Sequence, residues 1–194
     1  MKFLFRVIFS VALLVFGIMF LGRSHAEAAT LWSVKNDQSQ VGFVAKQSGA
    51  EVPGVFEHYQ AEITFHPEEL TDSHIRVEIT TESVNTQSGD RDKLIRSDAF
   101  FDSAAHPKAI FEASSFEQLS PDSFVAHGSL TMRGVTKKID LPFQASVEGD
   151  ELRAQGAAEI SRLDYGIGNG QWLDTAVIGE MVRITFAIEG IATK

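Results

Sequence analysis

The sequence predicts an all-β protein, built as one antiparallel barrel or sandwich with a single short helix. Three observations predict this fold. Apolar and polar residues alternate with a period of two along most segments after residue 40, which is typical of strands with one buried face. Tight-turn residues separate the clearest of these segments. Residues 89–98 depart from the alternation and have the composition of a short helix.

The N-terminal segment has the composition of a secretory signal peptide. Basic residues at its start precede an apolar run, residues 7–21, which is shorter than the ~20 residues that a membrane-spanning helix needs. Small residues follow, and we expect cleavage after Ala28, with cleavage after Ala26 and an uncleaved anchor as the alternatives. The sequence therefore predicts an exported protein whose mature domain spans residues 29–194.

Cleavage would leave an acidic domain without cysteine. Residues 1–28 contain three of the 17 basic and one of the 26 acidic residues, so the remaining 166 residues would have a net charge of −11. An acidic surface argues against binding to nucleic acid or to an anionic membrane face. The absence of cysteine excludes disulfides and thiolate chemistry, and the length suits one domain with its own core.

The strands follow one another along the whole mature region. Because each has a polar face, we expect antiparallel pairing, since parallel strands are buried on both faces. Gly149-Asp150 and residues 132–135 have the composition of tight hairpin turns. Roughly eight strands is close to the number that closes a small barrel able to hold one ligand. The predicted strands span residues 41–45, 60–65, 74–79, 109–113, 124–132, 139–147, 152–160 and 182–188.

The helix is predicted between two of these strands. Ser88 or Asp90 is suited to cap its first turn. Leu94 and Ile95 would then point inward. We expect this helix to form a plug or lid on the barrel.

The histidines do not have the close spacing of a typical zinc site. His25 lies in the predicted signal peptide, and His106 lies in a predicted loop before a proline. The parity of the strands directs the other four away from the core, with a metal site conceivable only if a bend brought two of them together: His58, His66, His74 and His127. We predict no metal site.

Carboxylates and serines supply no catalytic pattern either. The pairs Asp90/Asp92 and Asp98/Asp102 lie where loops and helix ends commonly carry aspartate, so we expect capping and solvation from them. No serine lies in the strained strand-turn-helix motif of a hydrolase. We predict no catalytic residues.

A glycine-rich stretch, residues 165–172, resembles a phosphate-binding loop in composition alone. Such loops follow a strand and begin a helix within a βαβ unit, and no helical pattern follows Trp172. The favoured interpretation is a loop that folds over the mouth of the barrel, with Tyr165 and Trp172 as its apolar cover.

The predicted interior is aromatic and contains small residues. Ten phenylalanines and two tyrosines remain after residue 28. The row from Leu152 to Ile160 is small at its centre, where it has Ala154, Gly156 and Ala158. Either opposing phenylalanines fill this space or an apolar cavity remains, and a cavity would suit a long hydrocarbon ligand.

Six segments, in this order, resemble the YceI-like, polyisoprenoid-binding family across nearly the whole mature chain. They are Gly54-Val55-Phe56, Ser83-Val84-Asn85-Thr86, Arg91-Asp92-Lys93-Leu94 followed by Phe100-Phe101-Asp102, residues 106–111, residues 128–137, and residues 162–168. The resemblance implies an extended, lipocalin-like antiparallel barrel that holds an isoprenoid or other long-chain amphiphile. It implies a periplasmic or secreted protein, often dimeric, with no catalytic residues. We expect a periplasmic location and predict no cofactor.

Two details refine the resemblance. Many members carry a His-Leu or His-Met pair where this chain has Lys46-Gln47-Ser48-Gly49, so no head-group role of that histidine transfers to it. Residues 165–172 resemble members associated with membrane proteins of the cytochrome b type. This implies a quinone-like ligand and a membrane cytochrome b partner.

The leading hypothesis is a lipid carrier or reservoir. The alternatives are an enzyme that acts on such a lipid or on a small oxidant, with a histidine or carboxylate as its base, and a regulatory interaction module for a membrane cytochrome. The ligand-binding residues that we predict are Phe43, Phe56, Phe65, Phe111, Ala154, Gly156 and Ala158 in the interior, and Tyr165, Ile167 and Trp172 at the mouth.

Overall fold

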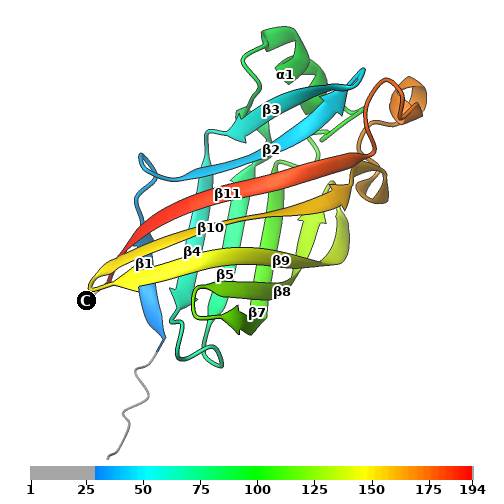
Figure 1. Cartoon of the computed structure of the whole chain (residues 1–194). Helices are drawn as coiled ribbons and strands as arrows, with labels where there is room; N and C mark the ends of the chain where they lie inside the picture. The colour runs from blue at the N-terminus through cyan, green and yellow to red at the C-terminus, as the bar shows by residue number, and fades with distance from the viewer. Residues whose placement is uncertain (1–28, 194) are drawn as a thin grey trace, which may run out of the picture.

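A computed structural model describes residues 29–193, and the predicted signal peptide lies outside these residues. Eight antiparallel strands hydrogen-bond in a closed ring, because β1 pairs with both β4 and β11 (Figure 1). This confirms the predicted antiparallel barrel. In ring order the strands are β1 (Thr30–Val34), β4 (Tyr59–Phe65), β5 (His74–Thr80), β7 (Lys108–Ser120), β8 (Ser123–Met132), β9 (Val135–Glu148), β10 (Glu151–Ser161) and β11 (Met181–Ala192).

The ring contains a strand that the alternation did not predict. In β1, Leu31 points to solvent while Trp32 is buried, so apolar residues lie on both faces and the pattern is lost. A contact distant in the sequence holds this strand: Nε1 of Trp32 donates a hydrogen bond of 2.8 Å to the carbonyl of Phe65. The number of strands agrees with the prediction, but its membership differs.

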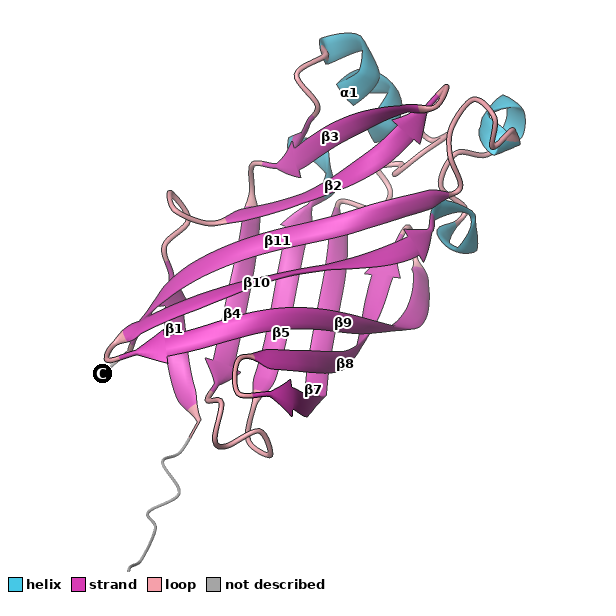
Figure 2. Cartoon of the chain, viewed as in Figure 1, coloured by secondary structure: helices cyan, strands magenta, loops and turns pink. Residues whose placement is uncertain are grey.

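The predicted strand near residues 41–45 lies outside the ring. It is β2 (Gln40–Gln47), which pairs with the first half of β11, whereas β1 pairs with the last residues of β11. β3 (Ala50–Phe56) continues the sheet from β2 to the short β6 (Val84–Asn85). These three strands extend the wall of the barrel at one end (Figure 2).

Both predicted hairpins are present. Gly149 has a φ of 61° in the two-residue turn from β9 to β10. Arg133 and Gly134 have φ of 48° and 75° in the turn from β8 to β9. Two consecutive left-handed residues match the right-handed twist of the flanking strands.

The predicted helix is α1 (Gly89–Arg96). Ser88 occupies its N-cap position, but the serine side chain makes no capping hydrogen bond. The loop of residues 162–180 contains two short 3-10 helices, Arg162–Tyr165 and Gly170–Leu173, and lies at the same end of the barrel as α1 (Figure 1). Among residues 29–193, no helix is long and apolar enough to cross a membrane.

Aromatic rings from β4, β7, β8 and β9 pack together in the core of the barrel. Phe65 lies 5.3 Å from Phe124 and 5.7 Å from Phe143 between ring centroids, and Phe116 completes the group. Each fully buried phenylalanine contributes on the order of 1.5–3 kcal/mol to the free energy of folding. This region, which we call the aromatic cluster, is a source of stability.

Candidate functional site

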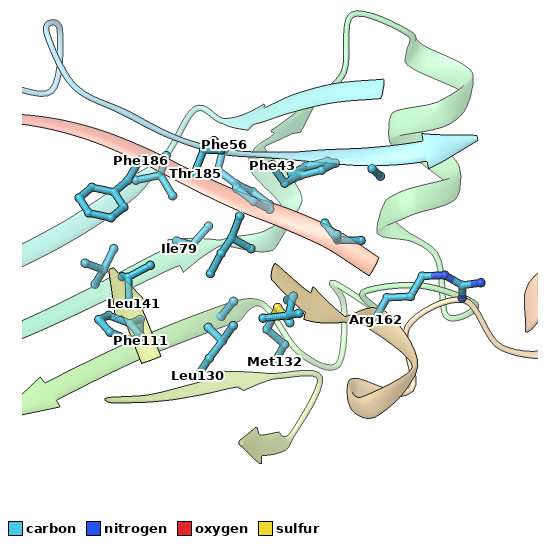
Figure 3. A pocket seen from close by; sticks show the side chains of 18 of the residues that line it. Phe43, Phe56, Ile79, Phe111, Leu130, Met132, Leu141, Arg162, Thr185 and Phe186 are labelled. Atoms are coloured by element: carbon cyan, nitrogen blue, oxygen red, sulfur yellow. The ribbon is translucent and has the colours of Figure 1, made fainter. Parts of the chain in front are cut away.

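An apolar cavity of about 240 Å³ lies inside the barrel. Thirty-six of the described residues line it, and only five of these are polar: Lys46, Gln47, Arg91, Arg162 and Thr185. Figure 3 shows side chains from several strands converging on this space. The volume is many times the space that one water molecule needs, and the wall offers few partners for water. A wall of this kind favours a hydrocarbon occupant.

The wall of the cavity is formed by alternate residues of the strands, whose side chains point inward. On β5, Ile75, Val77 and Ile79 line the cavity. Between them, Arg76 and Glu78 face outward and form ion pairs with residues of β7. The same alternation directs alternate residues of β11 inward, at positions 182, 184, 186 and 188. The predicted inward rows of these strands are therefore correct.

The structure places six of the ten predicted binding residues on the cavity wall: Phe43, Phe56, Phe65, Phe111, Ala154 and Ile167. The other four do not line it: Gly156, Ala158, Tyr165 and Trp172. The first two of these lie in the row that is small at its centre. The last two lie in the glycine-rich loop.

Gly156 is small because phenylalanines fill the space in front of it. A Cβ atom there would lie 2.7 Å from the ring of Phe186 and 2.9 Å from Cβ of Phe143. Gly128 has the same relation to the ring of Phe111, also at 2.7 Å. Both alternatives for the small residues therefore hold, in different places: rings fill the space beside the glycines, and a cavity remains between the rings.

Tyr165 and Trp172 form the packed base of the loop instead of an apolar cover over the mouth. Tyr165 is only 1% exposed, its hydroxyl has no hydrogen-bond partner among residues 29–193, and burial raises the pKa of that hydroxyl. The ring of Trp172 packs against Phe100 with centroids 5.7 Å apart. Ile167 is the residue of this stretch that reaches the cavity.

One arginine organises the whole loop, and the sequence did not single it out. Arg162 is 3% exposed, and burial lowers the pKa of its guanidinium. Figure 3 shows this group directed away from the apolar side chains of the cavity. Its nitrogens donate to five backbone carbonyls at 2.7–3.1 Å, those of Ile167, Gly168, Trp172, Ile178 and Gly179.

The glycines of the stretch make room for this arginine. Gly168 has a φ of +78°, and a Cβ atom there would collide with Nη1 of Arg162. Glycine is therefore needed both for backbone conformation and for close approach. An arginine that begins a glycine-rich stretch was the available signal, because its five donors can satisfy the many free carbonyls of such a loop.

The aspartate pairs are not all solvated as predicted. Asp92 is 7% exposed, and its carboxylate accepts hydrogen bonds from the backbone nitrogen of Thr86 at 2.8 Å and from its hydroxyl at 2.5 Å. The carboxylate ties α1 to the segment before it. Asp90 is exposed, in agreement with the prediction.

No histidine of residues 29–193 lines the cavity. His58, His74 and His127 are exposed, as their parity predicts, and His66 is half-buried. Nδ1 of His127 lies 2.7 Å from Asp140 on the outer face of the barrel. Within the described residues, no group of three histidine, cysteine or acidic side chains is arranged to hold a metal ion.

Solved structures have the same fold. The crystal structure of Burkholderia cenocepacia BcnA matches with a TM-score of 0.79 at 23% identity, over 81% of this chain and 99% of that one. A polyisoprenoid binding domain from Saccharophagus degradans, implicated in plant cell wall breakdown, matches with a TM-score of 0.66 at 17% identity, over 86% of this chain and 100% of that one.

Sequence comparison agrees. A UPF0312 protein of Azotobacter vinelandii is 28% identical over 190 residues, which cover 94% of this chain and 97% of that protein. A UPF0312 protein of Pseudomonas aeruginosa is 30% identical over 71% of this chain and 73% of its own length. The family model described as the YceI-like domain matches residues 32–190. The chain therefore belongs to the YceI-like family.

Proposed function

We propose that the protein binds a long-chain amphiphilic lipid of the isoprenoid type in its barrel, and carries or stores this lipid in the periplasm without chemical change. The observation that carries the proposal is the cavity, which has an almost entirely apolar wall inside a closed ring of strands. The domain from Saccharophagus degradans, which shares this fold, is described as polyisoprenoid-binding.

The energetics favour a chain as the part of the ligand that the protein recognises. Burial of each methylene contributes about 0.8 kcal/mol, so about ten buried carbons offset much of the cost of association. Phe43, Phe56 and Phe111 supply large apolar surfaces, and Thr185 is the only residue with a hydroxyl group among the described residues of the wall. Selection would then depend on the length and shape of the chain. Isoprenoid quinones and isoprenoid phosphates both belong to this class of ligand.

The predicted signal peptide supports the role of a carrier. A signal peptide over residues 1–28 would place the barrel in an aqueous compartment between two membranes, through which an isoprenoid does not diffuse freely. Enclosure of the chain in the cavity would keep it from water. An acidic, cysteine-free surface would keep the carrier soluble there.

Native mass spectrometry of the purified protein tests the proposal directly. We expect a bound mass that organic extraction releases as a long-chain lipid. A protein that is purified empty, and that then fails to bind isoprenoid alcohols, phosphates and quinones alike, would contradict the proposal.

A variant that fills the cavity gives a second test. Ala154→Trp places an indole where a small residue lines the wall, and we expect loss of lipid binding. Ala187→Trp is the matched control, since Ala187 is exposed and lies outside the cavity on the adjacent strand. Circular dichroism establishes that both variants fold. Equal lipid binding by both would locate the site elsewhere.

A further inference from the structure

The charged side chains that line the cavity are all cations. They are Lys46, Arg91 and Arg162, and no acidic residue of the described chain lines it. This is the reverse of the composition of the chain, which has 26 acidic and 17 basic residues. The charged residues of the cavity wall are therefore positive, although the protein as a whole is acidic.

Arg162 is not available to a ligand, because its guanidinium donates to five backbone carbonyls. The other two cations are free of ion pairs in the described part of the chain. Glu51 lies opposite Lys46 in the β2–β3 register but does not form an ion pair with it. The carboxylate of Asp92, next to Arg91, is engaged by Thr86. Neither cation is therefore within ion-pair distance of a described carboxylate.

Arg91 is held in place. Its Nε donates to the hydroxyl of Thr86 and its Nη2 to the carbonyl of the same residue, both at 2.8 Å. Thr86 is itself buried and bonded to Asp92. These contacts leave Nη1 without a partner among the described residues. A guanidinium with two fixed nitrogens and one open nitrogen is pre-organised to bind an oxygen anion.

Lys46 belongs to the same end of the barrel. It lies near the end of β2, and its carbonyl accepts a 2.8 Å hydrogen bond from Gly179 of the loop that Arg162 organises. The lysine is exposed although it lines the cavity. A lysine in this position packs its aliphatic stem along an apolar wall and keeps its ammonium group at the water boundary.

We propose that the bound lipid has an anionic head group, a phosphate or a carboxylate, which Lys46 and Arg91 bind at the mouth while the chain occupies the cavity. This inference rests on the proposed function and names the class of ligand within it. A ligand with a neutral head group, such as an alcohol or a quinone, would leave both cations without an anionic partner.

A matched pair of ligands tests the inference: geranylgeraniol and geranylgeranyl phosphate, which have the same chain. Calorimetric titration of the purified protein, below the concentrations at which micelles form, measures both affinities. We expect the phosphate to bind at least about tenfold more tightly at low salt, as is typical of a charge-assisted hydrogen bond. Added salt should weaken binding of the phosphate and leave binding of the alcohol unchanged.

Variants assign the effect to residues. Lys46→Gln and Arg91→Gln should each weaken phosphate binding by about tenfold and leave alcohol binding unchanged. Arg91→Lys retains the positive charge and should keep most of the preference, which separates loss of charge from loss of the contacts with Thr86. Lys138→Gln, on the exposed outer face of β9, removes the same charge away from the cavity and should change neither affinity.

The possible failures are distinct. If neither ligand binds, the proposed function is wrong. If both bind with equal affinity, or if Lys46→Gln weakens phosphate binding no more than Lys138→Gln does, the anionic head group is wrong while the lipid-binding barrel stands. Inorganic phosphate alone should not bind measurably. Tight binding of it would assign the two cations to a free anion instead of a lipid head group.

Discussion

The aromatic cluster and the loop of residues 162–180 are held together by opposite means. Phe65, Phe124 and Phe143 pack as apolar rings that come from three strands. The loop contributes Tyr165 and Ile167 to the core of the barrel, but its backbone is held by one buried guanidinium that satisfies five carbonyls. In the aromatic cluster, the stability is distributed over many apolar contacts. A single polar centre concentrates the stability of a whole segment in one side chain.

Phe124→Ala should have the largest effect on global stability. Phe124 is fully buried, so its truncation leaves a cavity and should lower the free energy of unfolding by about 3–5 kcal/mol. Leu94→Ala, on the half-buried inner face of α1, should cost clearly less. Denaturant unfolding monitored by circular dichroism compares the two. Equal losses would contradict the assignment of stability to the aromatic cluster.

Arg162→Met should have the next largest effect, concentrated in the loop. The change keeps much of the aliphatic volume but leaves buried carbonyls without donors, at a cost of about 1–3 kcal/mol for each group that water does not reach. Hydrogen exchange should accelerate at residues 166–180 far more than in β8 and β9.

Arg162→Lys provides the sharper version of this experiment. Lysine keeps the charge, but its three donors radiate from one nitrogen and cannot reproduce the planar fork of arginine. We therefore expect little rescue of loop protection. Full rescue by lysine would show that charge, and not the geometry of five donors, holds the loop.

Two glycines extend the comparison to smaller effects. Gly128→Ala brings a Cβ atom to 2.5 Å from the carbonyl of Glu112 and 2.7 Å from the ring of Phe111, so we expect a loss of about 1–3 kcal/mol. Gly89→Ala, at the start of α1, meets nothing within 4 Å and should stabilise by at most about 1 kcal/mol. In thermal unfolding, the melting temperature should fall for Gly128→Ala and should not fall for Gly89→Ala. A loss for both would mean that α1 is packed more tightly than its contacts indicate.

The smallest effect is expected outside both regions, at His127. The hydrogen bond to Asp140 raises the pKa of this imidazole above its ordinary value of about 6.5, with Glu117 adding to the effect. A raised pKa in the folded state means that the contribution to stability is present below the unfolded pKa and is lost as pH rises through the folded pKa. NMR titration should show the raised value, and Asp140→Asn should lower it. An unchanged value in that variant would exclude Asp140 as the main cause.

The alternation predicted most of the strands because side-chain direction in a strand is local, with a period of two residues. Ile75, Val77 and Ile79 show this: each lines the cavity, and the residues between them face outward. The alternation did not predict β1. Its buried residue, Trp32, is held by a hydrogen bond to the carbonyl of Phe65, which is 33 residues away in the sequence. A short strand held by a distant partner leaves no periodic pattern in the sequence.

The site was predictable in kind and only partly in detail. Aromatic and small residues in the inward rows indicated either a filled core or a cavity, and that choice depended on which glycine faces which ring. Gly156 faces Phe143 and Phe186 across neighbouring strands, so ring packing and not ligand space explains it. Tyr165 and Trp172 were assigned to the mouth by composition, yet Tyr165 is buried in the core and the ring of Trp172 packs against Phe100.

The sequence by itself determined most of the strands, the two tight hairpins, the short helix and the direction of most side chains, because each depends on neighbouring residues. Tertiary structure alone decided which strands close the ring, where the cavity remains, and that five carbonyls converge on Arg162. These features depend on contacts between residues far apart in the chain. The volume left between packed rings is a property of the whole barrel, and no single segment encodes it.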